Sequence, residues 1–427
     1  MPLSPVRPRR RPPRYSAGVV EASDGTRSRR RRRRWVVTVL AALVATVIAV
    51  FTFTVDRRVD AGLIEEWQAP AFYGTTGSEG SAPPGTLVRS ERLLSAPTGS
   101  EAWRILYHST DALGHDILTS GVVVAPVGAA PPEGRTIVSW GHPTTGAAQR
   151  CAPSVGVDPF LLIEGLGDFI DAGYVVVAAD YSGMGAAGPD SYLIGATEGG
   201  NLLDAARVAR TLPTGASDRL VLWGHSQGGH AALFAGQMAA EYAPELVLEA
   251  VAVAAPATDL GSLMNADIGT VSGVTISAYA FAAFSSVYGP STPDAQLTDI
   301  LTPDGAAAVP AMAKLCLFGQ NKQLHAIATP LIGKYLTADP ATTEPWKTML
   351  AENTPGAAAL PVPLFVAQGL TDTLVHPDLT SDFVQRARAL GVDVVYDEIA
   401  DTGHGEVALR AVPKVLPWLA SVGGGPR

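Results

Sequence analysis

The fold of this protein is decided by residues 220–229, LVLWGHSQGG. The run LVLW is apolar, as in a strand buried on both faces, and the residues that follow, HAALFAGQMAAEY, have a helical pattern. Between them, Gly224, Ser226 and Gly228 fit G-x-S-x-G, in which the serine occupies a sharp turn from strand to helix. The pattern therefore predicts that the Ser226 hydroxyl is presented at the carboxyl edge of a sheet.

A serine in this position needs a base to attack at neutral pH, and His404 is the histidine best placed for that role. It lies in the loop DTGHG, between the last predicted strand and a helical pattern. His225 adjoins the serine, and we interpret it as a packing residue whose side chain is directed elsewhere. Other histidines do not follow a strand end in this way: His108, His115, His230, His325 and His376.

Asp372 is the predicted group that orients the base. It lies in the loop GLTDT, directly after the predicted strand 363–368. Asp378 and Asp382 are weaker candidates because they fall within the next predicted helix. The chain order Ser226, Asp372, His404 is the order found in α/β-hydrolases.

Backbone amides are expected to hold the negative oxygen that forms when a serine attacks a carbonyl. The amide of Gln227, at the start of the helix, is the first predicted donor. The second should come from the loop after the predicted strand 136–140, which reads GHPTTG. Pro143 has no N–H, so Thr144 and Thr145 are both candidates, and the sequence does not choose between them.

The remaining strands form a repeating pattern around this centre. Short β-branched runs alternate with helical patterns, which predicts a mostly parallel sheet in a three-layer α/β sandwich. The first two runs are joined without a helix and predict an antiparallel edge. The predicted strands are residues 104–107, 117–125, 136–140, 174–179, 220–223, 248–254, 363–368 and 392–396.

A long interval interrupts this pattern between the predicted strands 248–254 and 363–368. It is far longer than an ordinary connection of about 2 to 6 residues, and it predicts an inserted helical cap at about residues 257–360. The cap contains an uncharged stretch, residues 268–293. A second membrane span is the alternative there, but its glycines and serines favour an apolar cap helix.

The N-terminal end differs in composition from the rest of the chain. Residues 1–34 contain twelve arginines and only two acidic residues, and residues 35–55 are uncharged and apolar. A helix of 21 such residues spans about 32 Å, near the roughly 30 Å thickness of a bilayer core. We predict a signal anchor with a cytoplasmic N-terminus and an exported body. A cleaved signal peptide or a nucleic-acid-binding arginine tail are the alternatives.

These features predict five segments. Residues 1–34 form a cytoplasmic tail, 35–55 the transmembrane anchor, 56–86 a linker, 87–421 the catalytic domain and 422–427 a short tail. A composition of 47% hydrophobic and 17% charged residues excludes ordinary disorder for most of the chain. No metal-binding or nucleotide-binding motif is found, so no cofactor is expected. Cys151 and Cys316 are compatible with one disulfide or with two free thiols.

The assembled motifs resemble those of the secretory lipase family of α/β-hydrolases. The resemblance extends from about residue 67 to residue 420, and it departs from the family's usual pattern at Pro143, where glycine is common. It is carried by residues 84–90, 139–146, 151–154, 180–185, 224–229, 369–372 and 403–404. It implies hydrolysis of triacylglycerol or other carboxylic esters, a cap over an acyl-chain site, and the triad Ser226, Asp372 and His404.

The expected protein is therefore a membrane-anchored, extracytoplasmic serine lipase or esterase, with a lipid or other ester as its partner and no nucleic acid. Two alternatives use the same triad: an acyltransferase, and an aminopeptidase in which Glu344 and Asp339 would bind a free amine. A third alternative is a binding domain without activity on a hydrolase scaffold. The sequence leaves the acyl chain length and the oligomeric state open.

Overall fold

The computed structural model describes residues 35–40, 44, 57–74, 80–292 and 294–426. The chain divides into two units, residues 1–57 and 58–427, and the second contains the sheet and the cap. Its described part has a nine-stranded sheet in the order β1-β2-β3-β5-β4-β6-β7-β8-β9. The strands are β1 (Leu87–Leu93), β2 (Ser100–Thr110), β3 (Asp116–Pro126), β4 (Arg135–Gly141), β5 (Val175–Ala179), β6 (Ala216–His225), β7 (Val247–Ala254), β8 (Leu364–Gly369) and β9 (Val394–Ile399).

The sheet is parallel from β5 to β9 and antiparallel from β1 to β3, and β3 also pairs antiparallel with β5. The mostly parallel sheet is thus confirmed, but the antiparallel part is larger than predicted. β1 was not predicted because its residues, LVRSERL, include four consecutive polar side chains and are mostly half-buried or exposed. Such an edge strand has no continuous apolar run to reveal it.

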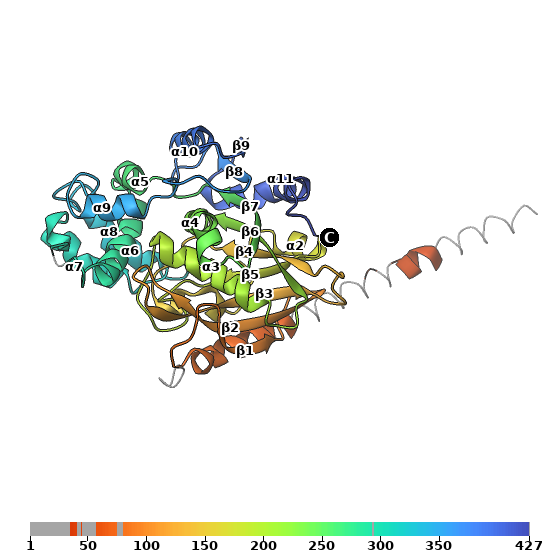
Figure 1. Cartoon of the computed structure of the whole chain (residues 1–427). Helices are drawn as coiled ribbons and strands as arrows, with labels where there is room; N and C mark the ends of the chain where they lie inside the picture. Colours follow the sequence, from red (N-terminus) through yellow and green to blue (C-terminus); the bar gives the residue numbers. More distant parts are fainter. Residues whose placement is uncertain (1–34, 41–43, 45–56, 75–79, 293, 427) are drawn as a thin grey trace, which may run out of the picture. The chain divides into compact units, whose positions relative to one another are not determined.

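Helices cover both faces of the sheet, as the sandwich prediction requires (Figure 1). Alternate strand residues divide between two cores: Ile137 packs in one and Val138 in the other. The first core includes residues of α3 (Gly195–Ala209), α4 (Gln227–Tyr242) and α10 (Pro377–Ala389), and the second includes residues of α2 (Leu166–Asp171) and α11 (Val407–Ser421). The sheet therefore holds the loops at its carboxyl edge between two rigid layers.

The predicted cap is inserted in the chain between β7 and β8 and forms a separate helical layer. Figure 1 shows its helices gathered on one side of the sheet. Its helices are α5 (Leu260–Asp267), α6 (Val271–Val287), α7 (Pro303–Met312), α8 (Asn321–Ala328) and α9 (Trp346–Glu352). The uncharged stretch becomes α6, whose Phe281 and Phe284 are fully buried in the cap core. The preference for a cap helix over a second membrane span therefore agrees with the structure.

In the described parts of the chain, no helix has the length and apolar character needed to cross a membrane. The predicted anchor at residues 35–55 lies mostly outside the described residues.

One prediction is wrong in part: the linker assigned to residues 56–86 includes a packed helix at residues 57–73. Its Ala69, Phe72 and Tyr73 are buried against Leu106 of β2. Its Glu65 accepts hydrogen bonds from the backbone and side chain of Ser95. The abundance of Gly, Pro, Ser and Thr that suggested a linker is found mainly in the residues after this helix. The buried apolar residues of the helix pack against distant parts of the chain.

Candidate active site

Ser226 lies at the turn between β6 and α4, with φ of 57° and ψ of −117°. This left-handed backbone is rare for a residue other than glycine, and such strain is typical of a functional turn. A β-carbon on Gly228 would lie 1.8 Å from the Gly141 carbonyl oxygen, and one on Gly224 would lie 2.1 Å from the Gly228 oxygen. No other residue fits at either position, which is the steric reason for the G-x-S-x-G pattern.

Ser226, His404 and Asp372 form one continuous chain of hydrogen bonds. The Nε2 atom of His404 lies 2.9 Å from the Ser226 hydroxyl oxygen, and its Nδ1 lies 2.7 Å from the Oδ2 atom of Asp372. An ionised carboxylate can only accept, so Nδ1 donates to Asp372 and Nε2 is left to accept the serine proton. These are the distances expected of a nucleophile, a base and a group that orients the base.

The Asp372 side chain is fully buried, yet its environment favours the charged form. Burial alone would raise the pKa of Asp372, but the hydrogen bond and charge of His404 lower it below its ordinary value. The backbone N–H groups of Leu374 and Val375 assist, each donating to Oδ1 at 2.9 Å. The weaker candidates Asp378 and Asp382 are both exposed on α10.

An apolar pocket opens at Ser226, and the cap forms much of its wall. It encloses about 620 Å³ of space, part of it open to solvent. Ser226 and Gln227 line it from the core domain, together with Thr144 and Tyr192. The apolar lining comes from Leu193, Ala257, Leu260, Leu263, Met264, Ile276, Ala280, Leu350, Leu374 and Val375.

One ionisable pair borders this pocket. Asp267, at the end of cap helix α5, lines the pocket, and its Oδ1 lies 3.2 Å from Nε2 of His376 in the core domain. Burial raises the pKa of Asp267, although the hydrogen bond to His376 opposes this shift. The contact connects the cap to the loop that follows Asp372.

The structure separates the two candidates for the second backbone donor. Thr144 lines the pocket with Ser226, and its hydroxyl contacts the Tyr192 hydroxyl at 2.8 Å. Thr145 lines a different hollow, and its carbonyl accepts from the cap residue Leu317 at 2.8 Å. The other predicted donor, Gln227, is the first residue of α4, where a backbone N–H has no partner within the helix.

His225 lies closer to the triad than the sequence analysis expected. Its ring packs against the His404 ring, with centroids 4.9 Å apart and planes inclined at 43°. Its Nδ1 lies 2.9 Å from Oε2 of Glu164. Glu164 could not be predicted from the sequence, because it is far from His225 along the chain and lies outside any strand or helix.

A second polar cluster lies beside the triad, and the sequence analysis missed it. Glu198 of α3 accepts from the Gln227 side chain at 2.6 Å, and its other oxygen lies 3.2 Å from Nδ1 of His230. Nε2 of His230 lies 2.8 Å from the carbonyl oxygen of Asn353, at the end of cap helix α9. Glu198 and His230 are completely buried. The cluster thus connects α3, the start of α4 and the cap.

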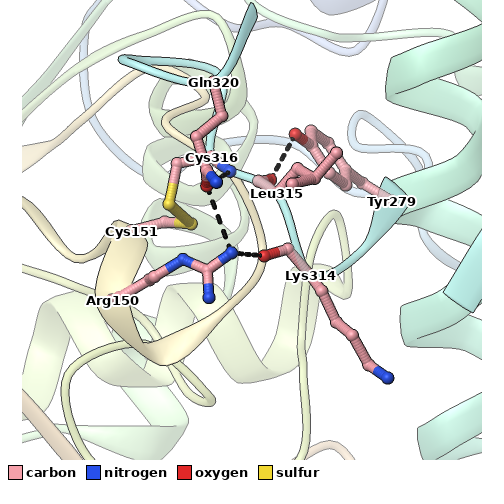
Figure 2. Close-up of a disulfide and its surroundings, with 7 residues drawn as sticks. All are labelled: Arg150, Cys151, Tyr279, Lys314, Leu315, Cys316 and Gln320. Carbon is pink, nitrogen blue, oxygen red and sulfur yellow. Dashed lines mark hydrogen bonds between the residues drawn. A yellow bond between two sulfur atoms is a disulfide. The ribbon is translucent and has the colours of Figure 1, made fainter. Parts of the chain in front are cut away.

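Cys151 and Cys316 are joined in a disulfide that connects the loop after Thr145 to the cap (Figure 2). Arg150 donates to the Gln320 side-chain oxygen at 3.1 Å, and the same oxygen accepts from the backbone N–H of Cys316. The cap is therefore held to the core by one covalent and several polar contacts near the catalytic edge.

Asp180, in the glycine-rich segment that follows β5, joins neighbouring segments of the core domain by hydrogen bonds. Its carboxylate accepts from the backbone N–H of Ser154 at 3.0 Å and from the Ser120 hydroxyl at 2.7 Å. Ser154 also contacts the hydroxyl of Tyr73 in the N-terminal helix. Within the described residues there is no cluster of three or more His, Cys, Asp or Glu side chains that could hold a metal ion.

The chain is similar to known lipases and esterases. The family model described as "Secretory lipase" matches residues 152–422, more than half of the chain. Lipase A of Moesziomyces aphidis is 29% identical over 232 residues, a match that covers 50% of this chain and 48% of that protein. The trichothecene C-3 esterase of Fusarium sporotrichioides is 26% identical over 388 residues, or 83% of each chain.

Among solved structures, lipase A of Candida antarctica in its closed state matches with a TM-score of 0.67 at 18% identity, covering 85% of this chain and 88% of that one. At this identity the likeness concerns the fold, and it confirms the predicted α/β-hydrolase architecture. The chain spans about half the length of the first curated relative that it matches.

Proposed function

The chain belongs to the secretory lipase family, and from this premise we propose that it hydrolyses carboxylic esters through a covalent acyl-enzyme. The resemblance found in the sequence is thereby confirmed at the level of the family. The observation that carries the proposal is the hydrogen-bonded chain from Asp372 through His404 to Ser226, which ends in an apolar pocket.

In the first half of the reaction, the Ser226 oxygen bonds to the ester carbonyl carbon while Nε2 of His404 takes its proton. The carbonyl oxygen becomes negative and receives hydrogen bonds from the backbone amides of Gln227 and Thr144. His404 then gives the proton to the departing alkoxide, the alcohol leaves, and the acyl group stays on Ser226. Asp372 remains ionised and holds the positively charged His404 ring.

In the second half, water attacks the acyl carbon and His404 takes one of its protons. The tetrahedral intermediate collapses, the bond to Ser226 breaks, and the serine recovers its proton from His404. The acid is released. An acceptor alcohol in place of water would give acyl transfer, so product analysis with and without added alcohol separates the two outcomes.

The lining of the pocket supports an acyl chain as the part of the substrate that the enzyme binds. Apolar side chains from α5 and α6 face the space beside Ser226, and apolar pockets bind apolar groups by removing them from water. The peptidase alternative required an acidic pair facing this space. The pocket lining does not include Glu344 or Asp339, and their carboxylates accept from Thr348 and Ala341, respectively.

The test is ester hydrolysis by the full chain with Ser226 replaced by alanine. We expect a loss of at least about 10³-fold in kcat for a p-nitrophenyl ester, and no labelling by a fluorophosphonate probe. Ser421→Ala, at the exposed end of α11, is the matched control and should keep full activity. Hydrolysis that survives in Ser226→Ala would refute the mechanism. Failure of the wild-type chain to react with the probe would favour a binding domain.

We also propose that the catalytic domain works outside the cell, attached by residues 35–55. The secretory family supports export, and the uncharged run after twelve arginines supports an anchor with a cytoplasmic N-terminus. Extraction of membranes with alkaline carbonate should leave the full chain in the pellet. Release of the intact chain into the supernatant would exclude the anchor.

A further inference from the structure

The helix at residues 57–73 has an apolar face that nothing in the described chain covers. Val59, Leu63, Ile64 and Trp67 are 49%, 51%, 56% and 81% exposed. Leu63 and Ile64 are adjacent, Val59 precedes Leu63 by four residues and Trp67 follows Ile64 by three, so all four lie on one side of the helix. We call these four side chains the outer apolar face. Single exposed apolar residues are ordinary, but a row of four large ones that includes a tryptophan marks an interaction surface.

The helix cannot turn to bury this face, because its opposite side is already packed. Ala69, Phe72 and Tyr73 are at most 8% exposed. Glu65 is 7% exposed and is hydrogen-bonded to Ser95. Rotation would expose these apolar side chains and break the hydrogen bonds of a buried carboxylate, and both changes are unfavourable. The outer apolar face is therefore a permanent feature of the folded domain.

The position of the helix in the chain indicates what covers the face. The uncharged run proposed as the anchor ends at Val55, and Val59 to Trp67 follow within twelve residues. At 1.5 Å per residue, a helix places them no more than about 18 Å along the chain from the end of that run. A chain that leaves a bilayer at residue 55 must therefore begin this helix at the bilayer surface.

We propose that the outer apolar face inserts into the outer surface of a phospholipid bilayer and holds the catalytic domain against it. This inference rests on the proposed anchor, but not on the proposed reaction. Tryptophan is enriched at the boundary between lipid and water, and helices with an apolar face lie in that boundary. The partner is the lipid surface itself and not a particular lipid.

Two further exposed apolar side chains extend this surface. Leu161 and Phe318 are 74% and 57% exposed, and they line a hollow together with Glu66 of the helix. Thr145 lines the same hollow, whereas its neighbour Thr144 lines the catalytic pocket. The loop that holds the proposed backbone donor thus lies between the catalytic pocket and a hollow beside the membrane-facing helix.

The insertion is driven by apolar burial and not by charge. Asp60 and Glu66 are exposed on the helix beside the apolar residues, and acidic residues outnumber basic ones in the domain. Anionic lipids would be repelled by these carboxylates. We therefore expect insertion into neutral phosphatidylcholine to be insensitive to salt, since screening affects charge pairs and leaves apolar burial in place.

The experiment places an environment-sensitive fluorophore at single cysteines in the full chain, reconstituted in phosphatidylcholine vesicles. The two native cysteines form a disulfide and do not compete for the label. Leu63→Cys and Trp67→Cys test the outer apolar face. Leu409→Cys is the control, because Leu409 is 59% exposed on α11. We expect a blue-shifted emission and quenching by brominated lipid at positions 63 and 67, unchanged in 0.5 M NaCl, and aqueous emission at position 409.

Two results would overturn the proposal. One is aqueous emission at all three positions. The other is a blue-shifted emission at position 67 that brominated lipid does not quench and that returns to aqueous emission when the protein is diluted. This result would mean that a second copy of the chain covers the face. Hydrolysis of a soluble p-nitrophenyl ester by the same labelled proteins reports the Ser226 chemistry separately, so failure of the reaction and failure of the insertion are distinguishable.

Discussion

Of the histidine–carboxylate pairs at the catalytic edge of this protein, His404–Asp372 and His230–Glu198 differ in what the second ring nitrogen meets. In His404–Asp372 that nitrogen meets the Ser226 hydroxyl, and the His404 side chain is 18% exposed. In His230–Glu198 it meets the Asn353 carbonyl, and both side chains are fully buried. The comparison supports the proposal that the same chemical pair carries a proton where it faces a hydroxyl and an open pocket, whereas it connects core and cap where it is enclosed.

The largest expected effect comes from breaking the first pair. Asp372→Asn should lower kcat by about 10³ to 10⁴-fold, because the amide no longer stabilises the charged ring or selects the tautomer that accepts from Ser226. The unfolding midpoint in urea should change little. The control is Asp378→Asn, which alters an exposed acid of α10. A greater loss in Asp378→Asn than in Asp372→Asn would mean that the acid is misassigned.

Breaking the second pair should mainly affect stability. Glu198→Gln keeps the shape but removes the charge that faces His230 and the Gln227 amide, so we expect a loss of about 2 to 3 kcal/mol in the free energy of unfolding. Glu241→Gln, near the exposed end of α4, should be neutral. If Glu198→Gln were as stable as the control but lost activity like Asp372→Asn, the distinction between the two pairs would fail.

Near the second pair lies an acid, Asp190, whose ionisation works against stability. Burial, assisted by the charge of Glu198, raises the pKa of Asp190 to about 7 from an ordinary value of 3.8. Between about pH 4 and 7 the folded chain keeps this proton while the unfolded chain loses it, so the Asp190 contribution to stability falls as the pH rises.

Asp190→Asn should remove this contribution. Relative to wild type, the variant should gain roughly 2 kcal/mol between pH 4 and pH 7.5, less than the full pKa difference implies because the side chain is only half-buried. Urea unfolding at the two pH values measures it. An equal difference between variant and wild type at both pH values would contradict the assignment.

The smallest effect is expected from a third pair, His225–Glu164, whose ring touches His404 but not the nucleophile. Glu164→Gln can still accept from His225, so the ring should stay in place while a nearby negative charge is lost. We expect a decrease in kcat of about three- to tenfold, with KM and the unfolding midpoint unchanged. A change in KM without a change in kcat would show that Glu164 contributes to binding and not to holding His404.

Prediction from sequence succeeded where a few adjacent residues are sufficient to determine the local structure. Gly224, Ser226 and Gly228 determine the turn by sterics alone, and each parallel strand is visible as a short apolar run. The helix at residues 57–73 was missed because Phe72 and Tyr73 are buried against Leu106 and Ala186, which are distant in the chain.

The sequence by itself determined the fold class, the cap and the three residues of the predicted triad. Each of these three residues follows a strand end, and parallel strands bring their carboxyl ends to one edge of the sheet. Only the tertiary structure placed Thr144 at the catalytic pocket and Thr145 at another hollow, put Glu164 and Glu198 beside the predicted triad, and exposed the outer apolar face. These features depend on which side of a loop or helix meets a distant segment, and no local pattern of residues encodes that choice.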